Sequence, residues 1–90
     1  MKVVWRAAAV ADIAAIHWHI HEENPLAARR VAEELYLAGA RLDLFPHRGR
    51  PGLAGTRELV AMRPYVLVYR VDEAVQEVRI LRVWHAAQER

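Results

Sequence analysis

Apolar residues recur along residues 28–45 at alternating steps of three and four, which is the spacing of one face of an α-helix. The positions that form this seam are Ala28, Val31, Leu35, Ala38, Leu42 and Phe45. Just before the seam stand Asn24 and Pro25, an N-cap residue followed by a residue favoured in the first helical turn. The pattern therefore predicts one continuous helix from residue 25 to residue 45.

A first helix is predicted upstream, over residues 7–22, from a similar spacing of apolar positions. These positions are Val10, Ile13, His17 or Ile16, and Ile20. The short joint at residues 23–24 makes the two helices antiparallel neighbours, a helical hairpin. Within the second helix, Gly39 is expected to be a weak point that costs about 1 kcal/mol relative to alanine.

The hydrophobic period changes after the hairpin. Two prolines and two glycines fall within residues 45–52 and predict a loop. Runs rich in β-branched and aromatic residues then predict strands at 57–62, 65–71 and 75–84, in addition to a short one at 3–5. In the last strand, alternation places Val78 and Ile80 on one face and Arg79, Leu81 and Val83 on the other.

The resulting order is β-α-α-β-β-β. Three strands joined by tight turns favour an antiparallel meander, with the helical hairpin packed on one face. We therefore expect a single α+β domain over residues 1–90, in which the hairpin covers a largely antiparallel sheet. The chain has no cysteine and no apolar run near the length needed to span a bilayer. A soluble cytoplasmic protein without a cofactor or a metal is the expectation.

The 13 basic and 11 acidic side chains are unevenly placed. Residues 44–71 contain a single acid, Glu58, and five arginines: Arg48, Arg50, Arg57, Arg63 and Arg70. Such a field attracts phosphates or an acidic peptide, and arginine favours bidentate contacts. The alternative is a solvated sheet face with scattered charge.

Six segments, in this order and spacing, give the chain a resemblance to the RelE/ParE superfamily of toxins from type II toxin–antitoxin systems. They are residues 2–5, 24–30, 44–51, 56–59, 64–71 and 80–85. The resemblance implies a toxin that inhibits growth, serves functions such as plasmid stabilisation, and is neutralised in a hetero-oligomer by a cognate antitoxin. It leaves the target open, because some members cut messenger RNA on the ribosome as mRNA interferases and others poison DNA gyrase.

If the chain is a metal-independent endoribonuclease, the resemblance and the chemistry point to Arg57, Arg63 and His85 as catalytic residues. Such a reaction needs an acid–base group and cations that stabilise the extra charge on the phosphate. Contacts to a target or to phosphate are expected from Arg48, Arg50, Arg57, Arg63 and Arg82. A capping or surface role for His85, and simple solvation or a weak pair with Glu58 or Glu77 for the arginines, are the alternatives.

Two absences favour the gyrase-directed class. Ala86, Ala87 and Gln88 follow the terminal histidine where many members of the superfamily have basic residues, and no carboxylate stands among the candidates, because Glu58 alternates away from Arg57. A toxin-like module that has lost its activity is a third alternative.

The hairpin supplies the expected antitoxin contacts. Trp18, Tyr36 and Leu37 fall outside the apolar seam and are expected to meet the antitoxin. His17 and His21 are one helical turn apart and could share a metal, but partly exposed structural histidines are the favoured interpretation.

Overall fold

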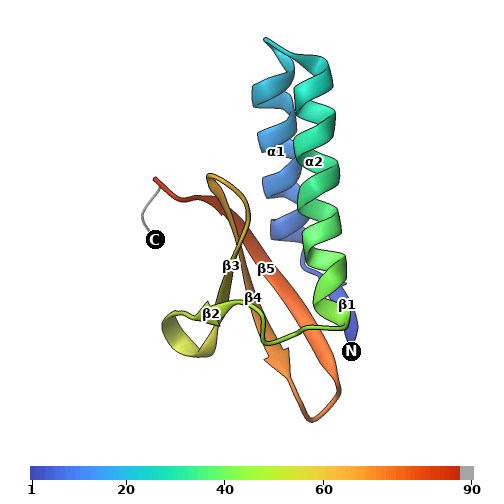
Figure 1. Ribbon diagram of the computed structural model, residues 1–90, viewed down its shortest axis with the longest axis vertical. Coiled ribbons are helices and arrows are strands. Elements are labelled where there is room, and N and C mark those ends of the chain that lie inside the picture. Colours follow the sequence, from blue (N-terminus) through green and yellow to red (C-terminus); the bar gives the residue numbers. More distant parts are fainter. Residues whose placement is uncertain (88–90) are drawn as a thin grey trace.

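The computed structural model describes residues 1–87 and has the two layers that the sequence predicts (Figure 1). A helical hairpin lies against one face of a five-stranded sheet, and the other face of the sheet is open. In chain order the elements are β1 (Lys2–Trp5), α1 (Ala7–His21), α2 (Pro25–Ala40), the 3₁₀ turn η1 (Arg41–Asp43), β2 (Arg50–Pro51), the turn η2 (Leu53–Gly55), β3 (Arg57–Met62), β4 (Tyr65–Asp72) and β5 (Glu77–His85). The predicted α+β class is confirmed.

The strands are arranged in the order β1-β5-β4-β3-β2. The meander β3-β4-β5 is antiparallel, as predicted, whereas β1 pairs in parallel with β5, so that Lys2 lies opposite Glu77. The two-residue strand β2, which the sequence did not predict, pairs with the start of β3. None of the helices within residues 1–87 has the length and apolar character needed to cross a membrane.

Helix α2 begins as predicted but ends earlier. The side chain of Asn24 accepts a hydrogen bond from the backbone N–H of Ala27 at 3.0 Å. The helix stops at Ala40, and the 3₁₀ turn η1 follows, so the prediction of one helix to residue 45 is wrong. The tighter turn still buries Leu42, but it rotates the next seam position outward, and Phe45 is 64% exposed.

The core lies between the hairpin and the sheet. The largest fully buried side chains are Tyr69, Ile13, Leu35, Leu42, Leu67, Ile80 and Val78. In α1 the buried positions are Ala9 and Ile13, and Ile16 packs against the same core. The expected seam residue Val10 lies beside this stripe and is exposed.

Gly39 has a packing role. A Cβ atom at this position would overlap the indole ring of Trp5 and would lie 2.7 Å from Cδ1 of Ile80, so only glycine allows α2 to approach β1 and β5 this closely. The sequence analysis counted this glycine only as a weak point of the helix.

A bulge in β5 changes which side chains face the helices. Val68 lies opposite Arg82 and Tyr69 opposite Ile80, so Leu81 is an extra residue without an opposing partner. The bulge shifts the alternation by one position, and Val83 is buried in the same cluster as Val78 and Ile80. The predicted placement of Val83 on the opposite face is therefore wrong.

Candidate functional site

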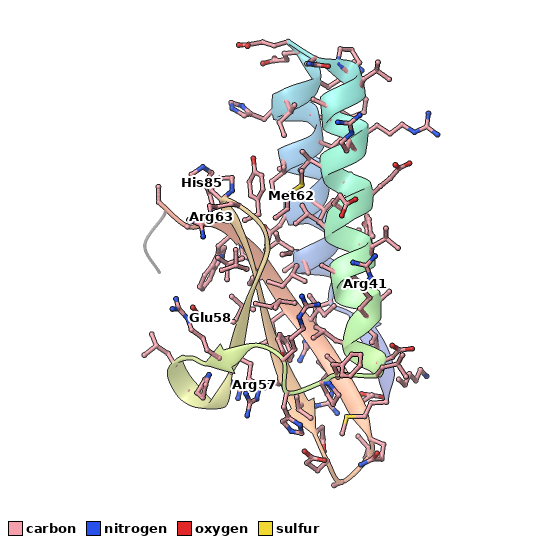
Figure 2. The ribbon with its side chains drawn as sticks, viewed as in Figure 1. Arg41, Arg57, Glu58, Met62, Arg63 and His85 are labelled. Atoms are coloured by element: carbon pink, nitrogen blue, oxygen red, sulfur yellow. The ribbon has the colours of Figure 1, made fainter. Side chains whose placement is uncertain are left out.

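Of the three candidate catalytic residues, Arg63 and His85 lie together and Arg57 lies apart from them. Figure 2 shows Arg57 near one end of the sheet and Arg63 and His85 together near the other. The strand register gives the same separation: Arg57 lies opposite Tyr69, whereas His85 lies opposite Tyr65, four residues away along β4. Four residues of β-strand span roughly 13 Å. This separation argues against a site in which Arg57 and His85 contact the same phosphate.

The Arg57 side chain supports a loop instead. Its Nη1 donates hydrogen bonds to the carbonyl oxygens of Gly49 at 2.6 Å and of His47 at 3.3 Å. Of the partners considered from the sequence, Glu58 lies near Arg50 and Glu77 pairs with Arg79. We conclude that this guanidinium stabilises the conformation of residues 44–49, between η1 and β2.

Tyr69, on β4, holds the same loop through its hydroxyl group. Its buried hydroxyl donates a hydrogen bond to the carbonyl of Pro46 and accepts one from the N–H of Gly49, both at 2.8 Å. Burial raises the pKa of Tyr69, and the hydrogen bond from Gly49 and the charges of Arg57 and Arg48 act in the opposite direction. A Cβ on Gly49 would lie 2.8 Å from both the Tyr69 hydroxyl and a carbonyl oxygen of Glu58, so the backbone contacts the tyrosine directly.

The other arginines of residues 44–71 divide into two kinds. Arg70 donates to the carbonyl of Ala54 at 2.6 Å, and Arg50 lies 3.9 Å from the buried carboxylate of Glu58. Arg48 and Arg63 are exposed, and within residues 1–87 their guanidinium groups make no hydrogen bond or ion pair. These two are the arginines best placed to meet a partner.

Arg82 is held by a carboxylate from α1. Its Nε and Nη2 donate to the two oxygens of Asp12 at 2.8 and 3.0 Å, and the N–H of Val83 donates to the same carboxylate at 2.8 Å. Asp12 raises the pKa of Arg82 through this hydrogen bond and through its charge. The bidentate pair occupies the fork that a phosphate would need, and this argues against Arg82 as a phosphate ligand. This pair could not be predicted from local sequence patterns, because the partners are 70 residues apart.

His85 and Tyr65 line a cleft of about 430 Å³ between α1 and the end of β5. Their rings meet edge to face with centroids 5.5 Å apart, and Nδ1 of His85 accepts a hydrogen bond from the N–H of Ala87 at 3.1 Å. His19 lines the same cleft from α1. The cleft brings imidazole and phenol groups together, but Arg82, the arginine that lines it, is already paired with Asp12.

The expected antitoxin contacts are all accessible. Tyr36 and Leu37 are 38% and 46% exposed and line an open hollow of about 670 Å³ on the hairpin, which His17 also lines. Tyr36 packs against the ring of Trp5 with centroids 4.9 Å apart. Trp18 is exposed near the tip of the hairpin and lies outside this hollow, in ring contact with His17 and His21.

No metal centre is built from these histidines. The rings of His17 and His21 are 5.6 Å apart, but no group of three or more His, Cys, Asp or Glu residues in the described part of the chain could hold a metal ion.

Two exposed apolar residues were missed in the sequence analysis. Leu44 and Phe45 follow η1 and are 74% and 64% exposed. Phe45 was expected to be a seam residue, and Leu44 was noted only as part of the superfamily resemblance. The signal that could have identified them is the proline at position 46, which ends the helical segment beside two large apolar side chains.

Comparison with known proteins gives a consistent result. Residues 3–90 match the family described as the ParE toxin of the type II toxin–antitoxin system parDE. The chain is 44% identical to Toxin RelE2 of Caulobacter vibrioides, over 97% of each chain, and 37% identical to the putative toxin Y4kP of Sinorhizobium fredii, over 98% of this chain and 91% of that one.

Solved structures agree with this family match. The fold matches a chain of the chromosomal ParDE system from P. aeruginosa with a TM-score of 0.84 and 28% identity, covering 94% of this chain and 95% of that one. A chain of the RelBE2 toxin–antitoxin complex from Mycobacterium tuberculosis matches with a TM-score of 0.61 and 33% identity, covering 97% and 92%.

Proposed function

Because this chain belongs to the ParE toxin family of type II toxin–antitoxin systems, we propose that it arrests bacterial growth by binding DNA gyrase and not by cutting RNA. The observation that carries this proposal is the separation of Arg57 from His85, together with the use of Arg57 and Arg82 in internal contacts. A nuclease of this class needs its cations around the scissile phosphate. A toxin that acts by binding needs only exposed side chains on a rigid scaffold.

An mRNA interferase is the second candidate. One observation favours it: Arg63 is exposed in the turn beside the cleft that His85 and Tyr65 line, so a base and a cation are available at one end of the sheet. The names of the two similar proteins, Toxin RelE2 and RelBE2, do not decide between the two activities.

Replacing His85 with alanine separates the two candidates. We expect His85→Ala to leave growth arrest within about twofold of wild type, because a binding toxin does not use the imidazole for proton transfer. Controlled expression in a bacterial host, with mapping of transcript ends and a DNA-damage reporter, makes the measurement. The purified wild-type chain should also inhibit supercoiling by gyrase.

Two outcomes would count against gyrase. Transcripts cut within minutes of induction, and lost on His85→Ala while antitoxin binding persists, would establish the interferase. No effect of the wild-type chain on growth would favour the inactive binding module.

The partner that neutralises this chain is expected to be an antitoxin that binds the outer face of the hairpin. Tyr36 and Leu37 form an apolar strip with a balanced pair of charges, Arg29 and Glu33, bonded at 3.2 Å beside it. Ala32 and Ala40 line the same open hollow, so the apolar strip follows α2 from residue 32 to residue 40, and such a strip suits an amphipathic helix of a partner.

Leu37→Glu is expected to weaken antitoxin binding by at least about tenfold, because it places a charge inside the contact. Isothermal titration with the antitoxin encoded beside the toxin measures this. Leu53→Glu is the matched control, since Leu53 is an exposed leucine in η2, outside the hairpin. Equal losses in the two variants would show that the hairpin strip is not the contact.

A further inference from the structure

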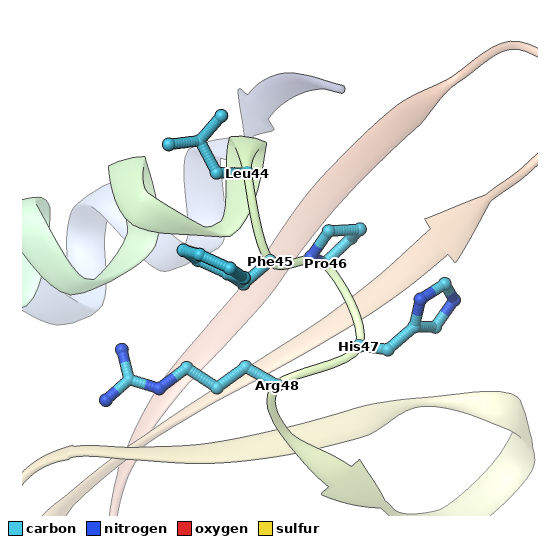
Figure 3. A pocket seen from close by; sticks show the side chains of 5 residues that line it. All are labelled: Leu44, Phe45, Pro46, His47 and Arg48. Atoms are coloured by element: carbon cyan, nitrogen blue, oxygen red, sulfur yellow. The ribbon is translucent and has the colours of Figure 1, made fainter.

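The segment after α2 displays apolar side chains that no part of the described chain covers. Leu44 and Phe45 are 74% and 64% exposed, and together with Pro46, His47 and Arg48 they line an open hollow of about 620 Å³. Figure 3 shows Phe45 and Arg48 extending from the loop in the same direction, with His47 pointing the other way. We refer to residues 44–48 as the Phe45 loop. Two adjacent large apolar side chains with such exposure mark a contact for another molecule.

The backbone of this loop is held by hydrogen bonds although the side chains of Leu44, Phe45 and Arg48 are exposed. Tyr69 holds the carbonyl of Pro46, and Arg57 holds the carbonyl of His47. The His47 ring is 2.9 Å from a carboxylate oxygen of Glu73 in the turn before β5. Five side-chain contacts, two from Tyr69, two from Arg57 and one between His47 and Glu73, thus hold the loop and the glycine that follows it. A fixed loop binds with little loss of conformational entropy, so this arrangement favours presentation to a partner.

The charges of residues 41–50 have one dominant sign, and the carboxylate of Glu73, which contacts the loop, lies on the His47 side. Residues 41–50 contain Arg41, Arg48 and Arg50 against a single acid, Asp43. The side chain of Arg48 is exposed and makes no ion pair within residues 1–87. An aromatic side chain beside an arginine is a composition enriched in the cores of protein interfaces.

From these observations we infer that the Phe45 loop is the surface by which this toxin binds its target protein. In the complex, Phe45 inserts into an apolar pocket of the target, and Arg48 pairs with a carboxylate at the rim of that pocket. The inference rests on the proposed function, since it assumes that toxicity comes from binding a protein. The occupant is a folded, acidic surface of the target. A protruding, fixed side chain needs a preformed pocket, whereas a flexible antitoxin segment is better matched by the long apolar strip on the hairpin.

The experiment uses the full chain carrying Phe45→Ser, Arg48→Glu or both. Growth arrest on induction, inhibition of supercoiling by purified gyrase, and affinity for the antitoxin are measured for each. We expect each single variant to lose at least about tenfold in both toxic readouts and the double variant to lose more, with antitoxin affinity within about twofold of wild type. Leu53→Ser and Arg6→Glu are the matched controls, because each changes an exposed residue of the same kind outside the loop and outside the apolar strip of α2, and should leave all three readouts unchanged.

Each other outcome overturns a specific statement. If the loop variants lose antitoxin affinity and keep their toxicity when antitoxin is absent, the loop belongs to the antitoxin and the inference fails. If the loop variants keep both their toxicity and their antitoxin affinity, the loop is not a docking surface. If the wild-type chain arrests growth without inhibiting gyrase, the gyrase proposal fails, and the growth readout of the variants still decides the inference. Circular dichroism melting of every variant excludes unfolding as the cause of a loss.

Discussion

Gly39→Ala is expected to destabilise the fold by about 2 kcal/mol, although the same change would stabilise an isolated helix. In a solvent-exposed helix, alanine is better than glycine by about 1 kcal/mol. Here the added methyl group would overlap the indole of Trp5 and press on Ile80. Overpacking of this kind costs up to about 3 kcal/mol, so the clash outweighs the gain in helix propensity. Urea unfolding followed by circular dichroism measures the difference.

A second substitution tests the cause. Trp5→Phe removes the ring atoms that the new Cβ would meet, so Gly39→Ala should destabilise less in that background than in the wild type. The explanation would be wrong if Gly39→Ala raised the stability of the wild-type chain, or if the two changes were simply additive.

Tyr69→Phe is expected to destabilise the fold by about 2 kcal/mol and to release residues 46–49. The substitution leaves the buried N–H of Gly49 and the carbonyl of Pro46 without the hydroxyl that binds both. Leaving a buried polar group unsatisfied costs about 1–3 kcal/mol. Amide hydrogen exchange should show faster exchange at Gly49, and urea unfolding should show the loss of stability.

Alkaline pH supplies a control for this variant. Burial raises the pKa of Tyr69 above its ordinary value of 10.0, so the neutral phenol is favoured in the folded state. That contribution is present below about pH 10 and is lost as the pH rises through the raised pKa. The stability difference between wild type and Tyr69→Phe should therefore shrink at high pH. Tyr65→Phe is the matched variant, since the Tyr65 hydroxyl makes no hydrogen bond within residues 1–87, and an equal loss there would contradict the assignment.

Elements with long, regular patterns were predictable from the sequence. The hairpin, the cap at Asn24 and the three strands of the meander follow from local spacing, and local spacing is set by the geometry of each element alone. The end of α2 was not predictable in the same way. Leu42 remains buried through a 3₁₀ turn, so the seam continues in the sequence for a few residues after the helix has ended.

The functional residues were harder to place because their roles depend on contacts between distant segments. Arg57 and Arg82 have the residue type and the charge of phosphate ligands, yet each is bonded to a group far away in the sequence or across a loop. The bulge at Leu81 has no signal in the local sequence pattern, and it places Val83 on the face of the sheet that packs against the helices. By contrast, the exposure of Arg48 and Arg63 agrees with the charge pattern, because a cation without an ion pair within residues 1–87 is stabilised by water.

The parallel pairing of β1 with β5 has a consequence for how quickly the domain forms. The hairpin and the meander each join segments that are neighbours in the sequence, but Lys2 and Glu77 are separated by 75 positions in the chain. Loop-closure entropy makes such contacts late in folding, after the local units have reduced the effective length of the loop. We therefore expect the first strand to dock last, so that the half-folded toxin exposes the edge of its final strand until that moment.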